Sequence, residues 1–360
     1  MYELMNKDVV VATIEECESF DDYSYSVVEQ FDDYLPYGFT TVDDWIDDRQ
    51  IAKHRTSIKR LMAELGIDNR RGFIDMIRCV SLTDTFWMRR EGSGLCWNDV
   101  SLYRNSFDDV VARIAFDGVG MYGRQFSSTS PEFGTSGSFD KCWVREQDGP
   151  HLIKRGSSGY ANAGFEPYSE KLCSDIFEAA GIDHVPYTLR TYHKKLASDC
   201  PLFTSENQGF VPIIRFFDKR FGIDDVLAFA AEHGGDEPFR QMVVMDAVCA
   251  NVDRHAGNYG FLVDNDTGEV IRMAPLFDQN MALLPHLMEQ DDFNEYFSMQ
   301  GPKIGRSFVG MARALLTPDM RHRLIALKDF EYEDPGFGYP AWKLEVANRL
   351  KRQQIDAILA

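Results

Sequence analysis

The sequence has no uninterrupted apolar run of eighteen residues, so we expect neither a membrane-spanning helix nor a membrane partner. Its first ten residues, MYELMNKDVV, have neither the basic start nor the apolar core of a secretory signal. Seven cysteines, an odd number without C-x-x-C spacing, give no disulfide framework and no zinc site, and they indicate reduced thiols in the cytoplasm. There are no internal repeats, and 360 residues suffice for two or three domains with a large core.

Basic residues are scarce at the start of the chain. Residues 1–50 contain fourteen acidic and two basic side chains, a net charge of −12 out of −19 for the whole chain. This argues against direct binding of a nucleic-acid backbone, which needs Lys and Arg. Two interpretations stay open: an acidic surface for a basic partner, or a solvated face that aids solubility. Runs of like charge are more often of the second kind.

Residues 242–284 combine an apolar helix, a polar loop at 251–258 and a hairpin. The pattern predicts strands at 259–263 and 270–274 around a turn at 265–268, and the return strand ends on the sequence P-L-F-D. Because a hairpin brings its ends together, Asp253, Asn258 and Asp278 can share one site.

These three side chains suit phosphoryl transfer. An Asp can accept the proton of an acceptor hydroxyl, while an Asn five residues later and an Asp after a following strand can hold Mg²⁺ on phosphates. The alternative is a polar turn between a buried helix and a surface hairpin, since D-x-x-x-x-N alone is common. The whole string, with the helix before it and P-L-F-D after it, favours a phosphoryl-transfer site over a simple polar turn.

The string D-x-V-x-x-N-x-D-R-H-x-x-N-Y-G-F-L at 246–262, followed by P-L-F-D, resembles HipA-like serine/threonine protein kinases, a bacterial family related in fold to phosphatidylinositol kinases. The resemblance covers about residues 130–284. It implies an α+β, two-lobed protein-kinase-like fold that binds ATP. It also implies that Asp253 is catalytic and that Asn258 and Asp278 bind Mg²⁺.

The segment 125–141, QFSSTSPEFGTSGSFDK, precedes a predicted hairpin with strands at 142–146 and 151–155 and a turn at 147–150. It is neither G-x-G-x-x-G nor a Walker A sequence, so alone it would be taken as a surface loop. Its position before a hairpin favours a loop that covers a nucleotide, because its glycines let the backbone approach phosphates closely. We expect Gly134, Ser136, Gly137 and Ser138 to contact the nucleotide.

Lys154 lies on the return strand of this hairpin, and Glu170 lies sixteen residues later on an apolar helix. Kinases pair such a Lys with such a Glu, and the Lys contacts the α- and β-phosphates. HipA-like kinases, which this sequence resembles, have the same order of a strand Lys, a helix Glu and then a motif that reads G-I-D-H-V-P at 181–186 in this chain. Glu166 is a rival for the role of Glu170.

The apolar run 210–217 predicts a buried strand leading to a hinge, with Arg215 and Phe216 as candidates to meet adenine. Asp246 is predicted to accept hydrogen bonds from backbone N–H groups of the polar loop rather than to bind metal.

Outside these motifs, strands are predicted at 9–14 and 25–31 and helices after an N-cap at Thr41 and near 71–79. The aromatic segment 81–103 could stack a ligand but is more typical of core. A helix starting at Pro340 is predicted to bury the stripe Trp342, Val346 and Leu350, with Lys343, Arg349, Lys351 and Arg352 facing solvent.

The predicted organisation is an N-terminal α/β extension (1–120), a small ATP-binding lobe (121–218) and a mainly helical catalytic lobe (219–360). The predicted reaction is ATP- and Mg²⁺-dependent phosphorylation of Ser or Thr in a protein, with autophosphorylation at Ser136 or Ser138. A small-molecule or lipid kinase and an inactive ATP-fold binding protein are the alternatives. The resemblance also implies an antitoxin-like regulatory partner, which no residue here indicates.

Overall fold

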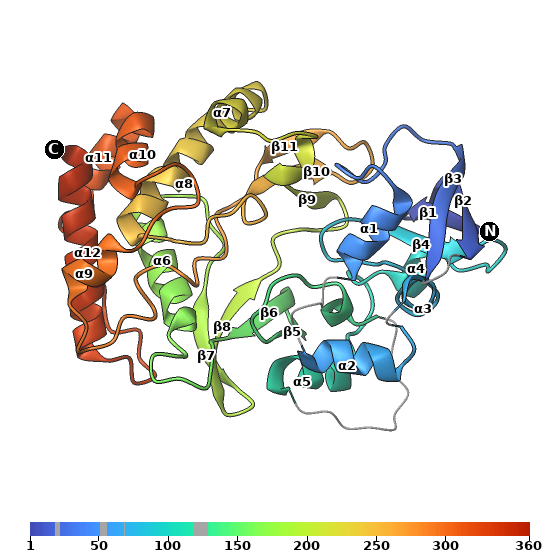
Figure 1. The fold of residues 1–360 in the computed structure, drawn as a ribbon, viewed down its shortest axis with the longest axis horizontal. Helices are drawn as coiled ribbons and strands as arrows, with labels where there is room; N and C mark the ends of the chain where they lie inside the picture. The colour runs from blue at the N-terminus through green and yellow to red at the C-terminus, as the bar shows by residue number, and fades with distance from the viewer. Residues whose placement is uncertain (19–21, 51–55, 68, 119–128) are drawn as a thin grey trace. The chain divides into compact units, whose positions relative to one another are not determined.

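A computed structural model describes residues 1–18, 22–50, 56–67, 69–118 and 129–360 (Figure 1). The chain divides into two compact units, each built from three separate segments. Unit 1 comprises Met1–Lys154, Leu202–Val211 and Leu262–Ile271, and unit 2 comprises Arg155–Pro201, Pro212–Phe261 and Arg272–Ala360. The domain boundaries drawn from the sequence stay a prediction.

Unit 1 contains an antiparallel four-stranded sheet in the order β3-β2-β1-β4. Its strands are β1 (Tyr2–Asn6), β2 (Val9–Glu18), β3 (Tyr23–Gln30) and β4 (Phe86–Arg90). The helices of this unit are α1 (Val42–Arg49), α2 (Thr56–Glu64), α3 (Arg70–Ile77), α4 (Trp97–Val100) and α5 (Asp109–Asp117). The predicted strands at 9–14 and 25–31 and the predicted helix near 71–79 are confirmed. So is the N-cap, because the Thr41 hydroxyl accepts a hydrogen bond from Asp44 N at 3.0 Å.

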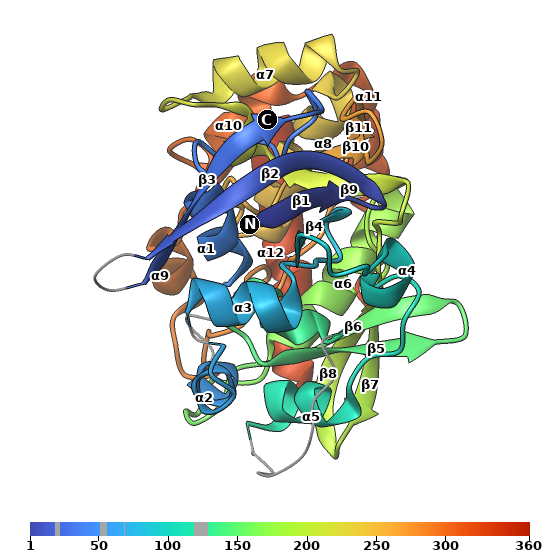
Figure 2. The same cartoon turned by 90° about the vertical axis from the view of Figure 1, so that its right-hand side faces the viewer.

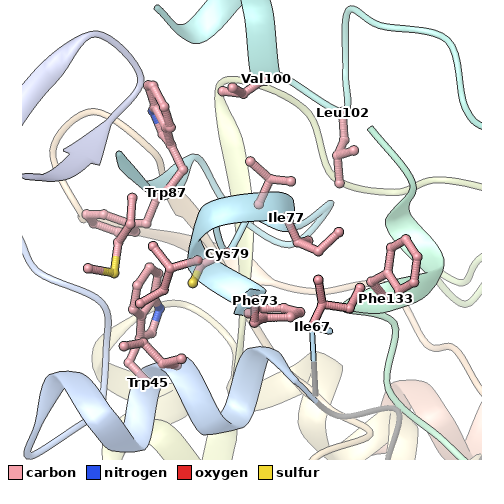
Figure 3. Close-up of a cluster of buried hydrophobic side chains, with 14 of the residues drawn as sticks. Trp45, Ile67, Phe73, Ile77, Cys79, Trp87, Val100, Leu102 and Phe133 are labelled. Carbon is pink, nitrogen blue, oxygen red and sulfur yellow. The ribbon is translucent and has the colours of Figure 1, made fainter. Parts of the chain in front are cut away.

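The aromatic segment is core, as its composition indicated. Trp87 and Phe73 are buried together with Ile77 and Phe133 (Figure 3). Trp97, 1% exposed, belongs to the same cluster, which thus draws on four different parts of unit 1. Burying rings of this size contributes much of the apolar driving force of a small unit.

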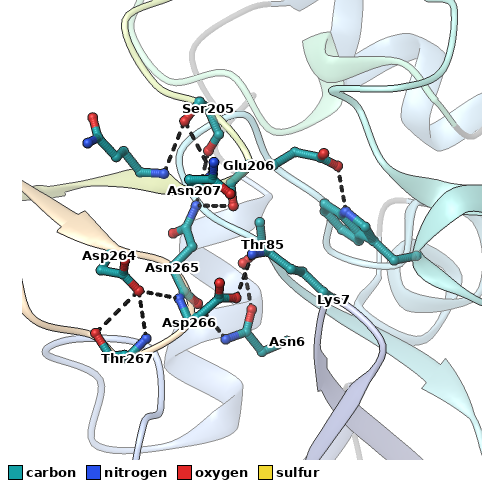
Figure 4. A network of polar contacts seen from close by, with 12 residues as sticks. Asn6, Lys7, Thr85, Ser205, Glu206, Asn207, Asp264, Asn265, Asp266 and Thr267 are labelled. Carbon is teal, nitrogen blue, oxygen red and sulfur yellow. Dashed lines mark hydrogen bonds and ion pairs between the residues drawn. The ribbon is translucent and has the colours of Figure 1, made fainter.

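A polar network ties the tip of the 260–273 hairpin into unit 1 (Figure 4). Asn265, predicted in the hairpin turn, is completely buried and donates to the carbonyls of Ser205 at 3.1 Å and Glu206 at 3.3 Å. Its own carbonyl accepts from Asn6 Nδ2 at 2.6 Å. Buried polar groups require such partners, so the network fixes the hairpin tip against β1.

Most of the remaining strands form hairpins. They are β5 (Lys141–Glu146) with β6 (Gly149–Arg155), and β7 (Thr188–Tyr192) with β8 (Lys195–Pro201), both antiparallel. The predicted hairpin at 259–274 is confirmed as β10 (Gly260–Asp264) and β11 (Val270–Met273).

The run 210–217 is not one continuous strand. Strand β9 (Gln208–Pro212) stops at Pro212, and a 3-10 helix follows over Ile213–Phe216. Proline lacks the N–H that would continue a ladder, so it ends the strand although the apolar pattern runs on.

Unit 2 is mainly helical. Its helices are α6 (Glu166–Ala180), α7 (Ile223–Glu232), α8 (Asp236–Cys249), α9 (Phe293–Ser298), α10 (Phe308–Leu315), α11 (Pro318–Ala326) and α12 (Ala341–Leu359). Helix α8 packs against α7, α10 and α12, and in Figure 2 it lies behind α7. Within the described residues, the structure contains no helix that combines the length and the apolar composition of a membrane span.

The prediction that four basic residues of α12 face solvent is wrong for two of them. Lys343 is 3% and Lys351 0% exposed. The Lys343 ammonium donates to Pro285 O at 2.8 Å and to Leu287 O at 3.0 Å. The Lys351 ammonium donates to Leu327 O, at the C-terminal end of α11, at 3.3 Å. Carbonyls without a helical partner need donors, and a long flexible ammonium supplies several.

Candidate active site

The loop 251–258 begins where α8 ends. Ala250 adopts a left-handed conformation with φ 50°, and Asn251 N donates back to Asp246 O at 2.9 Å. This left-handed turn ends the helix and leads the chain into the polar loop. Ala250 is completely buried, so the surrounding core holds a conformation that costs a residue with a Cβ about 1–2 kcal/mol.

A buried ion pair organises the loop. Arg254, 2% exposed, donates through Nε and Nη2 to the two carboxylate oxygens of Asp246 at 2.8 and 3.0 Å. Its Nη1 donates to Asn258 O at 2.8 Å and to Phe277 O at 2.7 Å. The predicted structural role of Asp246 is therefore confirmed, but its donors are the side chains of Arg254 and Asn251 instead of backbone N–H groups.

One guanidinium thus braces both ends of the site: the loop at Asn258 and the segment that leads to Asp278. Burial by itself lowers the pKa of Arg254, but the Asp246 carboxylate more than offsets this, so the net pKa is raised. Arg254 stays charged, and its hydrogen bonds make it a brace of the loop.

Asp253 is half-buried at the centre of the loop. Its backbone N donates to Asn251 Oδ1 at 3.1 Å, and its carbonyl accepts from His255 N at 2.8 Å and Asn258 Nδ2 at 3.2 Å. Among the described residues, none donates a hydrogen bond to the Asp253 carboxylate. A fixed backbone with an open carboxylate is what a base that receives a substrate proton requires.

Asp278 follows the P-L-F segment and has φ 59°, a left-handed conformation that Asp tolerates better than most residues. Its backbone N donates to the Tyr187 hydroxyl at 3.1 Å. Leu276 forms a parallel bridge with His184, and Val185 N donates to Leu276 O at 2.8 Å. The G-I-D-H-V-P segment therefore positions the P-L-F-D segment.

Tyr187 was missed by the sequence reasoning. Its pKa is raised well above the ordinary value by burial first, and the nearby charges of Glu170 and Asp278 raise it further. The hydroxyl therefore stays protonated. The sequence signal that could have identified Tyr187 is its position directly after the V-P dipeptide at 185–186.

The residues fit Mg²⁺. Because Asn258 donates through Nδ2 to Asp253 O, its Oδ1 is the atom that a metal ion would use, and Asp278 adds a carboxylate. Among the described residues, no group of three His, Cys, Asp or Glu side chains could hold a metal. Mg²⁺ does not need one, because it usually takes one or two carboxylates and completes its shell with phosphate oxygens and water.

Glu170 and its rival Glu166 both lie on α6 and are both buried. Glu170 accepts from the Ser198 hydroxyl, whereas Glu166 Oε2 accepts from Ser157 N at 3.2 Å. Glu166 therefore holds the start of the loop that precedes α6. Lys154 belongs to unit 1, and its pairing with Glu170 stays a prediction.

In unit 1, Lys154 on β6 lies directly opposite Lys141 on β5. Both side chains are buried, and the Lys154 ammonium lies 6.0 Å from the centroid of the Phe139 ring. Directly opposed residues of an antiparallel pair lie on the same face, so an anion bound there could contact both ammonium groups. Lys141 is a further candidate for phosphate binding that the sequence reasoning missed.

The segment before β5 is tied to Lys141, whose Nζ donates to Ser136 O at 2.6 Å. Gly137 has φ 90°, a conformation in which a residue with a Cβ is strained. Ser136 and Ser138 are exposed. Gly134 instead lies against the carbonyls of Val80 and Arg49. Residues 125–128 of the predicted loop are outside the described residues.

Arg215 and Phe216, the hinge candidates, lie on the 3-10 helix of unit 2. The Phe216 ring packs against Phe229 and Phe261, at centroid distances of 4.7 and 5.9 Å. This aromatic packing fixes the backbone of the candidate hinge.

No protein-family model matches the chain. In sequence, it is 29% identical over 133 residues to the serine/threonine-protein kinase CtkA of Helicobacter pylori (strain J99), which covers 33% of this chain and 41% of that protein. The match therefore spans less than half the length of this curated relative.

Among solved structures, HipA in the Shewanella oneidensis MR-1 complex of HipA, HipB and operator DNA has a TM-score of 0.57 at 12% identity, over 100% of this chain and 99% of that chain. The crystal structure of the Helicobacter pylori proinflammatory kinase CtkA has a TM-score of 0.49 at 17% identity, over 62% of this chain and 91% of that chain. The predicted α+β, kinase-like fold is confirmed by the full-length similarity to HipA. The chain has the fold of the HipA-like kinases, and its resemblance to this serine/threonine protein kinase family is confirmed.

Proposed function

We propose that the chain is an ATP- and Mg²⁺-dependent kinase that transfers the γ-phosphoryl group to a Ser or Thr hydroxyl of a protein. The observation that carries the proposal is the Asp246–Arg254 ion pair, which braces the loop with Asp253 and Asn258 and the segment ending at Asp278. The sequence similarity to a serine/threonine-protein kinase supports the choice of acceptor.

In the proposed reaction, Asp253 orients the acceptor hydroxyl and accepts its proton. Asn258 Oδ1 and the Asp278 carboxylate hold Mg²⁺, which when bound neutralises charge on the phosphates. Little covalent chemistry is required of the protein, because phosphoryl transfer depends mainly on positioning and on electrostatic stabilisation.

Nucleotide contacts are proposed for each unit by itself. In unit 1, Lys154 and Lys141 contact ATP phosphates, and the backbone around Gly137 covers them. In unit 2, the backbone at Arg215 and Phe216 meets adenine.

Autophosphorylation is part of the proposal. Two hydroxyls beside Gly137, those of Ser136 and Ser138, are exposed, whereas Thr129 and Ser130 in the same segment are buried. A phosphate at Ser136 or Ser138 adds about −1.5 to −2 charge. It would repel the ATP phosphates and lower activity.

A protein substrate and an antitoxin-like regulatory protein are the proposed partners. The related HipA structure contains HipB and operator DNA. For this chain we propose a protein regulator, with no direct contact between the chain and nucleic acid.

The test is incubation of the full chain with γ-labelled ATP, Mg²⁺ and bacterial lysate, compared with Asp253→Asn and with the exposed control Asp224→Asn. We expect labelled protein bands and phosphoserine or phosphothreonine with wild type and Asp224→Asn only. Activity of Asp253→Asn within about tenfold of wild type, ~1.4 kcal/mol in the barrier, would contradict the base assignment. A labelled small molecule would change the substrate class, and no label would contradict the kinase function.

A further inference from the structure

The first sheet of unit 1 has an open edge. Strand β3 is the outer strand in the order β3-β2-β1-β4. At its start the edge is covered, because Tyr23 O accepts from Arg70 Nη1 at 3.1 Å and Tyr25 N donates to Asp43 Oδ1 at 2.7 Å. From residue 26 to residue 30 every residue is exposed. No hydrogen bond from outside the sheet reaches the backbone of 26–30 within the part of the chain that the structure describes.

The side chains along this open stretch are unusual for an edge strand. Val27, Val28 and Phe31 are 44, 57 and 55% exposed. Soluble proteins commonly protect such edges with Lys, Pro, a β-bulge or a covering segment, because unpaired N–H and C=O groups recruit further strands. Residues 26–31, Ser-Val-Val-Glu-Gln-Phe, contain neither Lys nor Pro, but the register with β2 shifts at Val28, between the pairs Glu29–Thr13 and Val27–Ile14.

The surroundings of the open edge are acidic. Exposed carboxylates lie on β2 at Glu15 and Glu18, on β3 at Glu29 and just after it at Asp33. The two basic residues of the first fifty form ion pairs elsewhere: Lys7 with Asp266 at 2.5 Å, and Arg49 with Asp84. Neither therefore neutralises these carboxylates. We refer to residues 26–31 with these flanking carboxylates as the β3 edge.

We propose that the β3 edge binds an extended segment of another protein that alternates apolar with Lys or Arg residues and adds to the sheet as a fifth strand. Backbone hydrogen bonds supply the affinity in this mode, and the alternating side chains supply the specificity. The exposed side chains of Val27, Val28 and Phe31 offer apolar contacts to such a segment, and the flanking carboxylates attract its basic residues. The proposal is independent of the kinase reaction.

Charge selects this occupant over two others. A second copy of the chain would bring Glu29 and its acidic neighbours against the same residues of the partner copy, and like charges across a strand pair are destabilising. A nucleic acid would meet the same acidic surface, whereas its binding requires Lys and Arg.

Hydrogen–deuterium exchange of the full chain, read by mass spectrometry, tests the proposal directly. The probe is an acetylated and amidated (Val-Lys)₄ peptide. The controls are (Val-Glu)₄, and the (Val-Lys)₄ peptide with its two central valines replaced by proline, which keeps the charge and removes two N–H donors. We expect exchange in the fragment spanning 24–31 to slow at least tenfold with (Val-Lys)₄ and to change less than twofold with either control.

Variants separate edge pairing from general attraction to an acidic protein. Glu29→Lys and Val28→Lys should each weaken (Val-Lys)₄ binding at least tenfold, measured by fluorescence anisotropy. Glu91→Lys makes the same charge change at an exposed position after β4, the other edge strand, and should weaken binding less than twofold. Unchanged exchange of the buried β2 residues 11–14 in each variant shows that the sheet is intact.

The proposal is overturned by equal protection from the proline or (Val-Glu)₄ peptide, by equal weakening in Glu91→Lys, or by no protection at all. It is also overturned if residues 26–30 become protected without peptide as a dimer forms with rising protein concentration, because a second copy then occupies the edge.

Discussion

Arg254 gives the sharpest test of how the proposed site is held together. Arg254→Met removes the four hydrogen bonds that the guanidinium donates to Asp246, Asn258 O and Phe277 O. Among the described residues, Asn251 Nδ2 is then the remaining donor to the buried Asp246 carboxylate. Removing one partner of a buried ion pair costs about 3–5 kcal/mol. This is a large part of the about 5–15 kcal/mol that separates a typical folded protein from its unfolded state.

Asp246→Leu leaves the guanidinium unpaired and should cost a similar amount. The double variant Asp246→Leu/Arg254→Met removes both charges, so the burial penalty disappears. What remains is the cost of leaving the carbonyls of Asn258 and Phe277 without a donor, about 1–3 kcal/mol each. The loss in the double variant should therefore fall below the sum of the single losses by about 2 kcal/mol or more.

The assay is urea unfolding of all three variants beside phosphoryl transfer. Stability should recover partly in the double variant, whereas activity should not, because Asn258 and the approach to Asp278 have lost their brace. Arg254→Lys is a milder control: it keeps the charge but cannot reproduce the planar fork, so we expect a smaller loss of stability and a large loss of activity. Additive stability losses, or a double variant with activity within tenfold of wild type, would refute the reasoning.

Further variants test Asp278, the two opposed lysines of β5 and β6, and the buried Lys343 of α12. Asp278→Asn should abolish the Mg²⁺ dependence of ATP binding, measured by calorimetry with and without Mg²⁺; an unchanged dependence would show that Asp278 is no ligand. Lys141→Met and Lys154→Met should each raise the Kd for ATP at least tenfold, about 1.4 kcal/mol, whereas Lys303→Met, at an exposed site, should not. Burial lowers the pKa of Lys343 to about 8, so between pH 8 and the ordinary value of 10.5 the unfolded state binds more protons and the contribution of Lys343 to stability rises with pH. Urea unfolding should therefore show the stability of wild type rising relative to Lys343→Met from pH 8 to pH 10, and a constant difference would contradict the lowered pKa.

The loop and hairpin that carry Asp253, Asn258 and Asp278 could be predicted from the sequence because they are local: a helix, a turn and two strands within forty-three residues. Lys141 could not be found, because the turn between β5 and β6 was assigned four residues instead of two. A loop longer by two residues shifts the pairing by two, so Lys154 would oppose Trp143 and not Lys141.

The burial of several polar side chains could not be predicted from the periodicity of the sequence. Lys343, Lys351 and Asn265 are buried because they satisfy backbone groups of segments distant in the chain, such as Leu287 for Lys343. A pattern of apolar and polar residues records neither these distant carbonyls nor their need for donors.

The division of the chain into interleaved segments has a consequence for synthesis on the ribosome. The chain passes between the two units five times, and unit 1 is complete only when residue 271 is present. Its first segment ends at Lys154, 117 residues earlier, which at about 5–20 residues per second corresponds to roughly 6–23 s of translation. During that interval the N-terminal segment has been synthesised but the residues that complete unit 1 have not. Asn6 then lacks its hydrogen bond to the Asn265 carbonyl, whereas the apolar residues of the β3 edge are already present. Excising residues 1–154 would not release a free-standing domain, and a nascent chain at this stage is an expected client for chaperones.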